Sequence, residues 1–240
     1  MDRLFVEEVK SVAGLLQAAS APVVIGAVYL FIRDKYEKEP YKMLFLGLLY
    51  GIYSTFVIWA VGTAIEKIFP HTESPFFSAF ISSAGIEEAI KFLFLYFLVF
   101  HNPNFNEPFV GIVYGVFVAL GFAWLENIIY VLHKDLGGYE TAFARGIFSV
   151  PGHGLFGLEM GYYLALAKFY AQKRYLLGAF FVPYLLHGIY NYILFLDRNI
   201  LWIPFLLFVL FLWWLGFKRM KLLLERSPFK NTFIKKDRIL

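Results

Sequence analysis

The sequence of 240 residues contains no cysteine, and only 17% of its residues are charged. The absence of cysteine excludes disulfide bonds, thiolate metal sites and a cysteine nucleophile. The scarcity of charge, combined with 60% hydrophobic residues, excludes a soluble domain of this size, which would expose far more polar sequence. The chain is therefore expected to be a polytopic membrane protein.

Features that would divide the chain are also missing. The first ten residues, MDRLFVEEVK, are mixed in charge, and no small-residue cleavage site follows a short apolar core, so we expect no cleavable signal peptide. The sequence shows no internal repeat and no low-complexity tract. We expect one transmembrane domain over residues 1–217, followed by a basic cytoplasmic tail over residues 218–240.

Seven stretches are apolar over the length of about 20 residues that a helix needs to cross the hydrocarbon core. Lipid offers the backbone no hydrogen-bond partner, so each stretch is expected to be helical. The predicted fold is an all-α bundle of about seven transmembrane helices. The expected spans are residues 12–32, 43–65, 76–100, 109–132, 145–167, 176–196 and 201–217.

Lysine and arginine are distributed unequally between the connections, and such residues concentrate on the cytoplasmic side of a membrane. Fifteen of the 22 lie in the connections 33–42 and 168–174 and after residue 217, whereas five lie in the N-terminal segment and the alternate connections. Lys91 and Arg145 lie within expected spans. The N-terminus is therefore predicted to be outside and the C-terminus in the cytoplasm.

Several spans carry polar side chains in their interiors. A charged side chain at a helix centre costs roughly 2.5–3.5 kcal/mol on insertion scales, so the four most deeply placed charges would cost on the order of 10 kcal/mol if unpaired in lipid. These side chains must therefore face the bundle interior. The candidate site residues are Glu87, Glu88, Lys91, Glu126, Asn127, Arg145, His153, His187 and Asn191.

Four of these residues are expected at similar depth. Position within each span places Glu87, Glu126, His153 and His187 in one layer about 10 Å thick, given a rise of about 1.5 Å per residue. Four polar groups from four helices at one depth indicate a site. The alternative is a buried ion pair and hydrogen-bonded histidines that only hold the helices together.

Helical spacing groups the candidates further. Glu87 and Lys91 are four residues apart and share a face, as do His187 and Asn191, while Glu88 and Lys91 are three apart. Either carboxylate could pair with the ammonium group. Glu87 is the candidate base, and Glu88 is assigned a supporting role.

Short motifs on these spans resemble those of a known family. EEAIK (residues 87–91) matches EExxK, FAWLEN (122–127) matches FxxxEN, HGLFG (153–157) matches HxxFG, and HGIYN (187–191) matches HGxxN. RDKYEKEP after the first span resembles an acidic, proline-ended connector of the same family. The match covers about residues 29–191 and is similar to the PrsW group of intramembrane proteases, within the superfamily of CAAX prenyl proteases and bacterial relatives.

The resemblance implies a cell-membrane, multi-pass protease that cuts a membrane-embedded substrate near the outer face. Such a substrate is typically a single-pass protein, for example an anti-sigma factor. The expected partners are this substrate and the lipid bilayer, and no nucleic acid. Glu126 stands where CAAX prenyl proteases carry the histidine of an FxxxH motif, which favours the PrsW branch.

The residues themselves allow a metal-free mechanism. Desolvation and a nearby ammonium group act in opposite directions on a buried glutamate, so Glu87 could serve as general base near neutral pH. His187 and Asn191 are suited to donate hydrogen bonds to the substrate carbonyl. Two further residues, Glu126 and His153, would orient the water or protonate the leaving amine. Arg145 would anchor a loop or the substrate backbone.

A zinc mechanism uses the same residues. Glu126, His153 and His187 could bind Zn²⁺, with Glu87 as base. The H-E-x-x-H spacing is absent, and Lys91 beside a cation site is unfavourable, which weighs slightly towards the metal-free mechanism. The sequence leaves both open.

Two other classes of function compete with proteolysis. Intramembrane carboxylates and histidines also mark ion paths, so a proton- or ion-coupled transporter is the main alternative. A transporter would more often show an internal repeat and broken helices. A scaffold that merely binds a partner helix is the third reading, and it predicts that Glu87→Gln leaves function intact.

Overall fold

The computed structural model describes residues 3–70 and 74–231, and this part of the chain is helical with no strand. The predicted all-α class is therefore confirmed. The elements in chain order are α1 (Arg3–Arg33), α2 (Tyr41–Ile68), the π-helix η1 (Phe77–Gly85), α3 (Ile86–Val99), α4 (Pro108–Val131), α5 (Tyr139–Ile147), α6 (Ser149–Phe169), α7 (Arg174–Phe195), the 3₁₀ turn η2 (Asn199–Leu201) and α8 (Trp202–Glu225).

Five helical segments of the described chain are long and apolar enough to cross a membrane. They are Ser11–Arg33, Tyr41–Ile68, Pro108–Val131, Arg174–Phe195 and Asn199–Glu225. The other two expected spans are helical but irregular. The third begins with η1 and continues as α3, and the fifth is divided between α5 and α6 at Phe148.

Pro151 accounts for the division between α5 and α6. A proline ring clashes with the carbonyl four residues earlier, and proline has no N–H to donate. That carbonyl belongs to Ile147, where α5 ends. The predicted polar stripe of Arg145, Ser149 and His153 is therefore interrupted, with Arg145 on α5 and His153 on α6.

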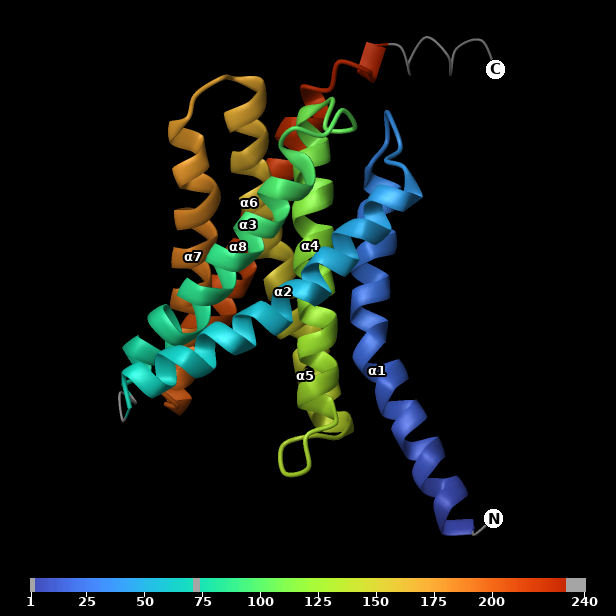
Figure 1. Ribbon diagram of the computed structural model, residues 1–240, viewed down its shortest axis with the longest axis vertical. Helices are drawn as coiled ribbons and strands as arrows, with labels where there is room; N and C mark the ends of the chain where they lie inside the picture. The colour runs from blue at the N-terminus through green and yellow to red at the C-terminus, as the bar shows by residue number, and fades with distance from the viewer. Residues whose placement is uncertain (1–2, 71–73, 232–240) are drawn as a thin grey trace.

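The chain passes back and forth between two ends of the bundle (Figure 1). The α1–α2, α3–α4 and α6–α7 connections and the end of α8 lie together at one end, at the top of the view. The end of α2, the start of η1, and the α4–α5 and α7–α8 connections lie at the other end. The connections that are rich in lysine and arginine are the ones at the first end. The assignment of this end to the cytoplasm stays a prediction.

Helix α4 lies in the middle of the bundle and is buried along most of its length (Figure 1). It approaches α6 through paired glycines: a Cβ on Gly115 would lie 2.3 Å from the Gly157 carbonyl oxygen, and one on Gly161 would lie 2.0 Å from that of Gly111. Backbones can approach this closely only where side chains are absent. This contact sets the depth of α6 against α4, and so of His153 against Glu126.

Helix α8 continues past residue 217 to Glu225, so the first part of the predicted basic tail is helical. Arg219 lies against α6, with its Nε 3.4 Å from Oε2 of the buried Glu159. Residues 232–240 of that predicted tail lie outside the described residues.

The connector between α1 and α2 carries a group of buried carboxylates. Asp34, Glu39 and Glu107, the last at the start of α4, are each at most 3% exposed. The Glu39 backbone N–H donates to Asp34 at 3.0 Å, and the Tyr114 hydroxyl of α4 donates to the Glu39 carboxylate. Burial, reinforced by repulsion from neighbouring carboxylates, raises the pKa of Asp34 to about 6 and those of Glu39 and Glu107 to about 7.

Other charged groups face this cluster. Lys38 lowers the pKa of Asp34, the Tyr114 hydrogen bond lowers that of Glu39, and the Glu37 carboxylate raises both. None of these opposing effects outweighs the burial. The folded protein therefore binds protons at this connector more tightly than the unfolded chain does.

We expect the stability of the protein to fall as pH rises through about 6 to 7. The ordinary pKa values are 3.8 for Asp and 4.5 for Glu, so the folded state holds extra protons between those values and the raised ones. The resulting stabilisation is complete below pH of about 4 and is lost as pH rises through the raised values. Glu107→Gln, which removes one buried ionisation, should unfold at a higher temperature than wild type at pH 8 and should depend less on pH. Thermal unfolding in detergent between pH 5 and 8 measures this, and an equal pH slope in both proteins would contradict it.

Candidate active site

The first polar cluster is carried by the junction of η1 and α3. Gly85 permits the wide turn of the π-helix, because a Cβ there would lie 2.6 Å from the Phe80 carbonyl oxygen. The normal α-helix resumes at Ile86, so Glu87, Glu88 and Lys91 occupy its first two turns. Single-turn π segments frequently occur at functional sites because they shift the register of the side chains that follow.

These three side chains form a buried ion cluster. Lys91 Nζ lies 2.6 Å from Glu88 Oε1 and 3.5 Å from Glu87 Oε2, and the three residues are 1%, 0% and 7% exposed in that order. The ammonium group also lies 4.3 Å from the centroid of the Phe122 ring of α4. Lys91 therefore pairs most closely with Glu88 and leaves Glu87 as the carboxylate with more access.

A chain of hydrogen bonds joins this cluster to α7. The Asn191 side-chain amide donates to Ser83 Oγ at 2.7 Å, and Ser83 donates to Glu87 Oε1 at 2.9 Å. His187 bonds through Nδ1 to Glu88 Oε1 at 2.8 Å and through Nε2 to Asn191 at 3.0 Å. If Glu88 is ionised, Nδ1 of His187 carries the ring proton, and Nε2 of His187 accepts a hydrogen bond from the Asn191 amide.

A second network connects α4, α5 and α6. The Nη2 atom of Arg145 lies 2.6 Å from Glu126 Oε2, and its Nε–H donates a hydrogen bond to Asn127 Oδ1 at 3.0 Å. His153 Nε2 lies 3.1 Å from the same Glu126 oxygen. Asn127 in turn donates to the backbone carbonyl of Ala19 on α1 at 2.8 Å. Glu126 thus holds both Arg145 and the His153 ring in place.

The two networks meet at their histidines. The His153 and His187 rings are perpendicular, with centroids 5.1 Å apart, and Phe156 stacks on His187 with centroids 4.7 Å apart. All nine residues singled out in the sequence are therefore linked by direct contacts. Sequence reasoning assigned no role to Ser83 or Tyr190, which also lie in this region. The only signals for them were their spacings from Glu87 and His187.

A cavity of about 460 Å³ opens onto the two networks. Its lining includes Glu87, Glu126, Arg145, His153, His187 and Asn191. It also reaches Phe195 and Trp202 at the α7–α8 connection. The lining therefore extends to the α7–α8 connection, which lies at the end of the bundle opposite the α1–α2 connector (Figure 1).

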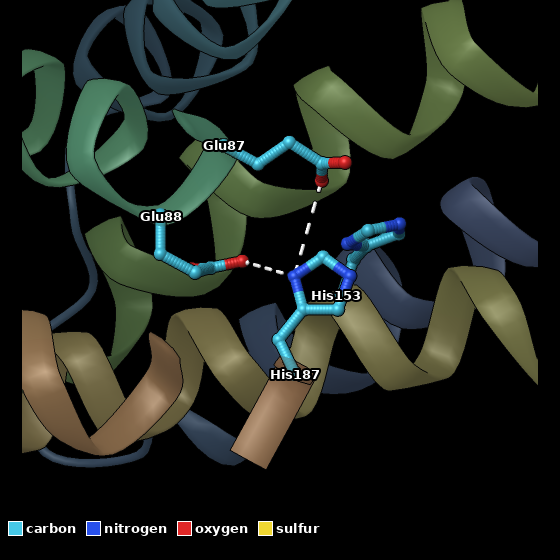
Figure 2. A group of neighbouring side chains, drawn as sticks. All are labelled: Glu87, Glu88, His153 and His187. Atoms are coloured by element: carbon cyan, nitrogen blue, oxygen red, sulfur yellow. Dashed lines mark hydrogen bonds and ion pairs between the residues drawn. The ribbon is translucent and has the colours of Figure 1, made fainter. Parts of the chain in front are cut away.

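Four neighbouring side chains, of which all but Glu88 line the cavity, point toward one another (Figure 2). Glu87, Glu88, His153 and His187 each offer one ligand atom, and these atoms all lie within 4.8 Å of one another. Glu87 Oε2, Glu88 Oε2 and His153 Nδ1 are buried without any hydrogen bond from the described residues. Two carboxylates and two imidazoles with such unsatisfied acceptors could hold a divalent metal ion. Glu126 lies outside this group.

The comparisons with known proteins identify the family of the chain. The model of the PrsW family, described as intramembrane metalloproteases, matches residues 39–215. The chain belongs to this family. A protease PrsW of Geobacillus kaustophilus is 39% identical over 86% of this chain and 91% of its own length, and one of Bacillus subtilis is 38% identical over 86% and 94%. No solved structure matches the chain.

Membership of the PrsW family makes the chain an intramembrane protease, whose substrate is a membrane protein in the bilayer. The long apolar helices agree with an integral, multi-pass protein of the cell membrane. The matched residues 39–215 contain all nine candidate site residues. The family is described as metal-dependent, and the buried group of four residues is the part of the described chain with suitable ligands.

Proposed function

We propose that this chain hydrolyses a peptide bond of a single-pass membrane protein, such as an anti-sigma factor, near the outer face of the membrane. The observation that carries the proposal is a group of four buried ligand side chains, in which Glu87 Oε2, Glu88 Oε2 and His153 Nδ1 accept no hydrogen bond from the described residues and Lys91 Nζ lies 3.5 Å from the first. Buried acceptors require a hydrogen-bond donor or a cation. A water molecule held there would lie beside a carboxylate able to take its proton.

Glu87 is the proposed general base. Its Oε1 is fixed by Ser83, and its Oε2 is the unsatisfied atom within the group. Glu87 removes a proton from the water, and the water oxygen forms a bond to the substrate carbonyl carbon. When the C–N bond breaks, the same proton passes to the leaving amine. Lys91 lies close enough to stabilise the ionised form of Glu87 between turnovers.

The donor set also fits a resident divalent metal ion. Glu88, His153 and His187 would hold it, the last after losing the proton on Nδ1, which leaves Glu87 free as the base. Three protein ligands with one open position are typical of catalytic zinc, which lowers the pKa of bound water and polarises a carbonyl group. Glu126, through His153 Nε2, would fix the ring so that Nδ1 faces the group. Lys91 opposes metal binding electrostatically, but its charge is shared with two carboxylates.

Cutting near the outer face is consistent with the position of the cavity. Its lining includes Phe195 and Trp202 at the α7–α8 connection, which lies at the end predicted to be outside. A substrate helix would have to unwind locally so that its backbone could reach Glu87, because a helix keeps its carbonyl groups hydrogen-bonded internally. The cavity volume leaves room for an extended segment of a few residues.

We expect a membrane-permeable zinc chelator to lower cleavage by at least about 100-fold, with recovery on adding Zn²⁺. The assay uses purified protein reconstituted in vesicles with single-pass anti-sigma factors. Elemental analysis of the same preparation should find about one metal ion per chain in wild type and less in His153→Ala. Full cleavage by protein shown to contain no metal would contradict the metal assignment and leave the glutamate mechanism.

A further inference from the structure

The hydrolysis proposed above requires a hydrogen-bond donor for the negative charge that develops on the substrate carbonyl oxygen. The amide hydrogens of Asn191 are engaged, one by Ser83 and one by His187. The His187 Nδ1 proton faces Glu88. Neither of the two donors expected from the sequence is therefore free in this arrangement.

The remaining polar residues of the networks are also engaged. Ser83 donates to Glu87, and the His153 Nε2 proton faces Glu126. Arg145 is bound through Nη2 and Nε and lies flat against the Tyr130 ring, 4.0 Å from its centroid. These bonds leave Arg145 Nη1 and the ion-paired Lys91 Nζ as donors of the networks, and cavity residues outside the networks are the other candidates for the oxyanion donor.

Tyr190 fits this requirement best among the cavity residues whose hydroxyl groups are free within the described chain, which also include Ser82 and Ser149, because its ring is the one held by aromatic contacts. It lies three residues after His187, on the same face of α7, and lines the cavity. Its hydroxyl makes no hydrogen bond with the described residues. On α6, a Cβ at Gly152 would lie 3.8 Å from the hydroxyl oxygen, so a larger side chain there would cover the group.

The Tyr190 ring is held rigidly. It makes edge-to-face contacts with Phe156 at 5.8 Å and with Phe205 at 4.9 Å between centroids, and the residue is only 5% exposed. Tyr130, the other tyrosine that lines the cavity, is 42% exposed. A donor fixed in a poorly hydrated site stabilises charge more strongly than a mobile donor in water.

We propose that the Tyr190 hydroxyl is the oxyanion donor of this protease. As the water oxygen bonds to the carbonyl carbon, the electron pair of the C=O double bond moves to the carbonyl oxygen. Tyr190 donates a hydrogen bond to that oxygen and keeps its proton throughout, while the water proton passes to Glu87. When the C–N bond breaks, the electron pair returns and the hydrogen bond weakens.

The test compares Tyr190→Phe with wild type in vesicles, with a panel of single-pass transmembrane peptides as substrates. Tyr184→Phe is the matched control, because it removes a hydroxyl from the same helix at a position that does not line the cavity. We expect Tyr190→Phe to lower kcat by about 100- to 1000-fold with KM within about threefold of wild type. Its unfolding temperature and that of the control should remain those of wild type.

Four outcomes would count against this role. A Tyr190→Phe protein with wild-type kcat would overturn the assignment of Tyr190 and leave the proposed hydrolysis intact. A rise in KM alone, or a loss of kcat accompanied by a lower unfolding temperature, would assign Tyr190 to substrate binding or to packing. Absence of cleavage by wild type itself would overturn the proposed hydrolysis, and the role of Tyr190 with it.

Discussion

Glu87→Gln is expected to lower kcat by about 1000-fold, because a positioned general base contributes roughly 100- to 10,000-fold and glutamine cannot take a proton. The substitution preserves the size of the side chain and its capacity to accept a hydrogen bond from the Ser83 hydroxyl. Lys91 keeps its closer partner, Glu88, at 2.6 Å. The fold should therefore be retained, and the loss should appear in kcat with little change in KM.

The matched control for this prediction is Glu66→Gln, an exposed carboxylate at the end of α2. It makes the same chemical change away from the cavity and should cleave at the wild-type rate. Reconstituted cleavage and thermal unfolding are measured on both variants. Cleavage by folded Glu87→Gln within about tenfold of wild type would remove Glu87 from the mechanism and support the scaffold reading of the site.

Lys91→Met is expected to destabilise the protein by about 3–5 kcal/mol, the usual cost of removing one partner from a buried ion pair. Methionine is nearly as long as lysine, so the loss comes from charge and not from an empty space. The substitution leaves Glu87 and Glu88 buried beside each other without their common cation. Unfolding by added denaturing detergent in mixed micelles measures the change.

A double variant separates charge from packing. In Glu88→Gln/Lys91→Met both members of the closer pair are neutral, so the protein should regain much of the stability lost in Lys91→Met. If the single substitution cost less than about 1 kcal/mol, the ion pair would not hold α3 in place. If the double variant were no more stable than the single, the ammonium group would matter for its contact with Phe122.

Much of the fold and of the site followed from the cost of placing polar groups in lipid. Apolar length alone located the spans, because a helix must be about 20 residues long to cross. The nine site residues lie together because charged and amide side chains avoid lipid and so converge in the bundle interior. The division at Phe148 was not predicted, although Pro151 carries the signal for it.

The remaining features depend on how the helices pack. The pairing of Arg145 with Glu126 joins α5 to α4, and the bond of Glu88 to His187 joins α3 to α7. No spacing within a single helix reveals such contacts. Ser83 and Tyr190 carry neutral hydroxyl groups that cost little in a membrane helix, so hydropathy does not mark them. The partner of Glu159 is Arg219, in a segment expected to be a tail.

The transporter alternative makes a different use of the same residues. An ion path needs polar groups spread from one face of the membrane to the other. The nine site residues instead gather around one cavity, while the buried carboxylates at the α1–α2 connector and the Glu159–Arg219 pair form separate groups. This arrangement favours chemistry at one depth over conduction.

The most direct measurement of the central claim is cleavage of a single-pass anti-sigma factor in water enriched in ¹⁸O. If the groups around Glu87 activate water, the new C-terminal carboxylate of the amino-terminal fragment must carry one ¹⁸O atom after a single turnover, and its mass should rise by about 2 Da. Glu87→Gln in the same vesicles should yield no labelled fragment above background. Fragments without the label, or equal labelled product from wild type and Glu87→Gln, would contradict the account.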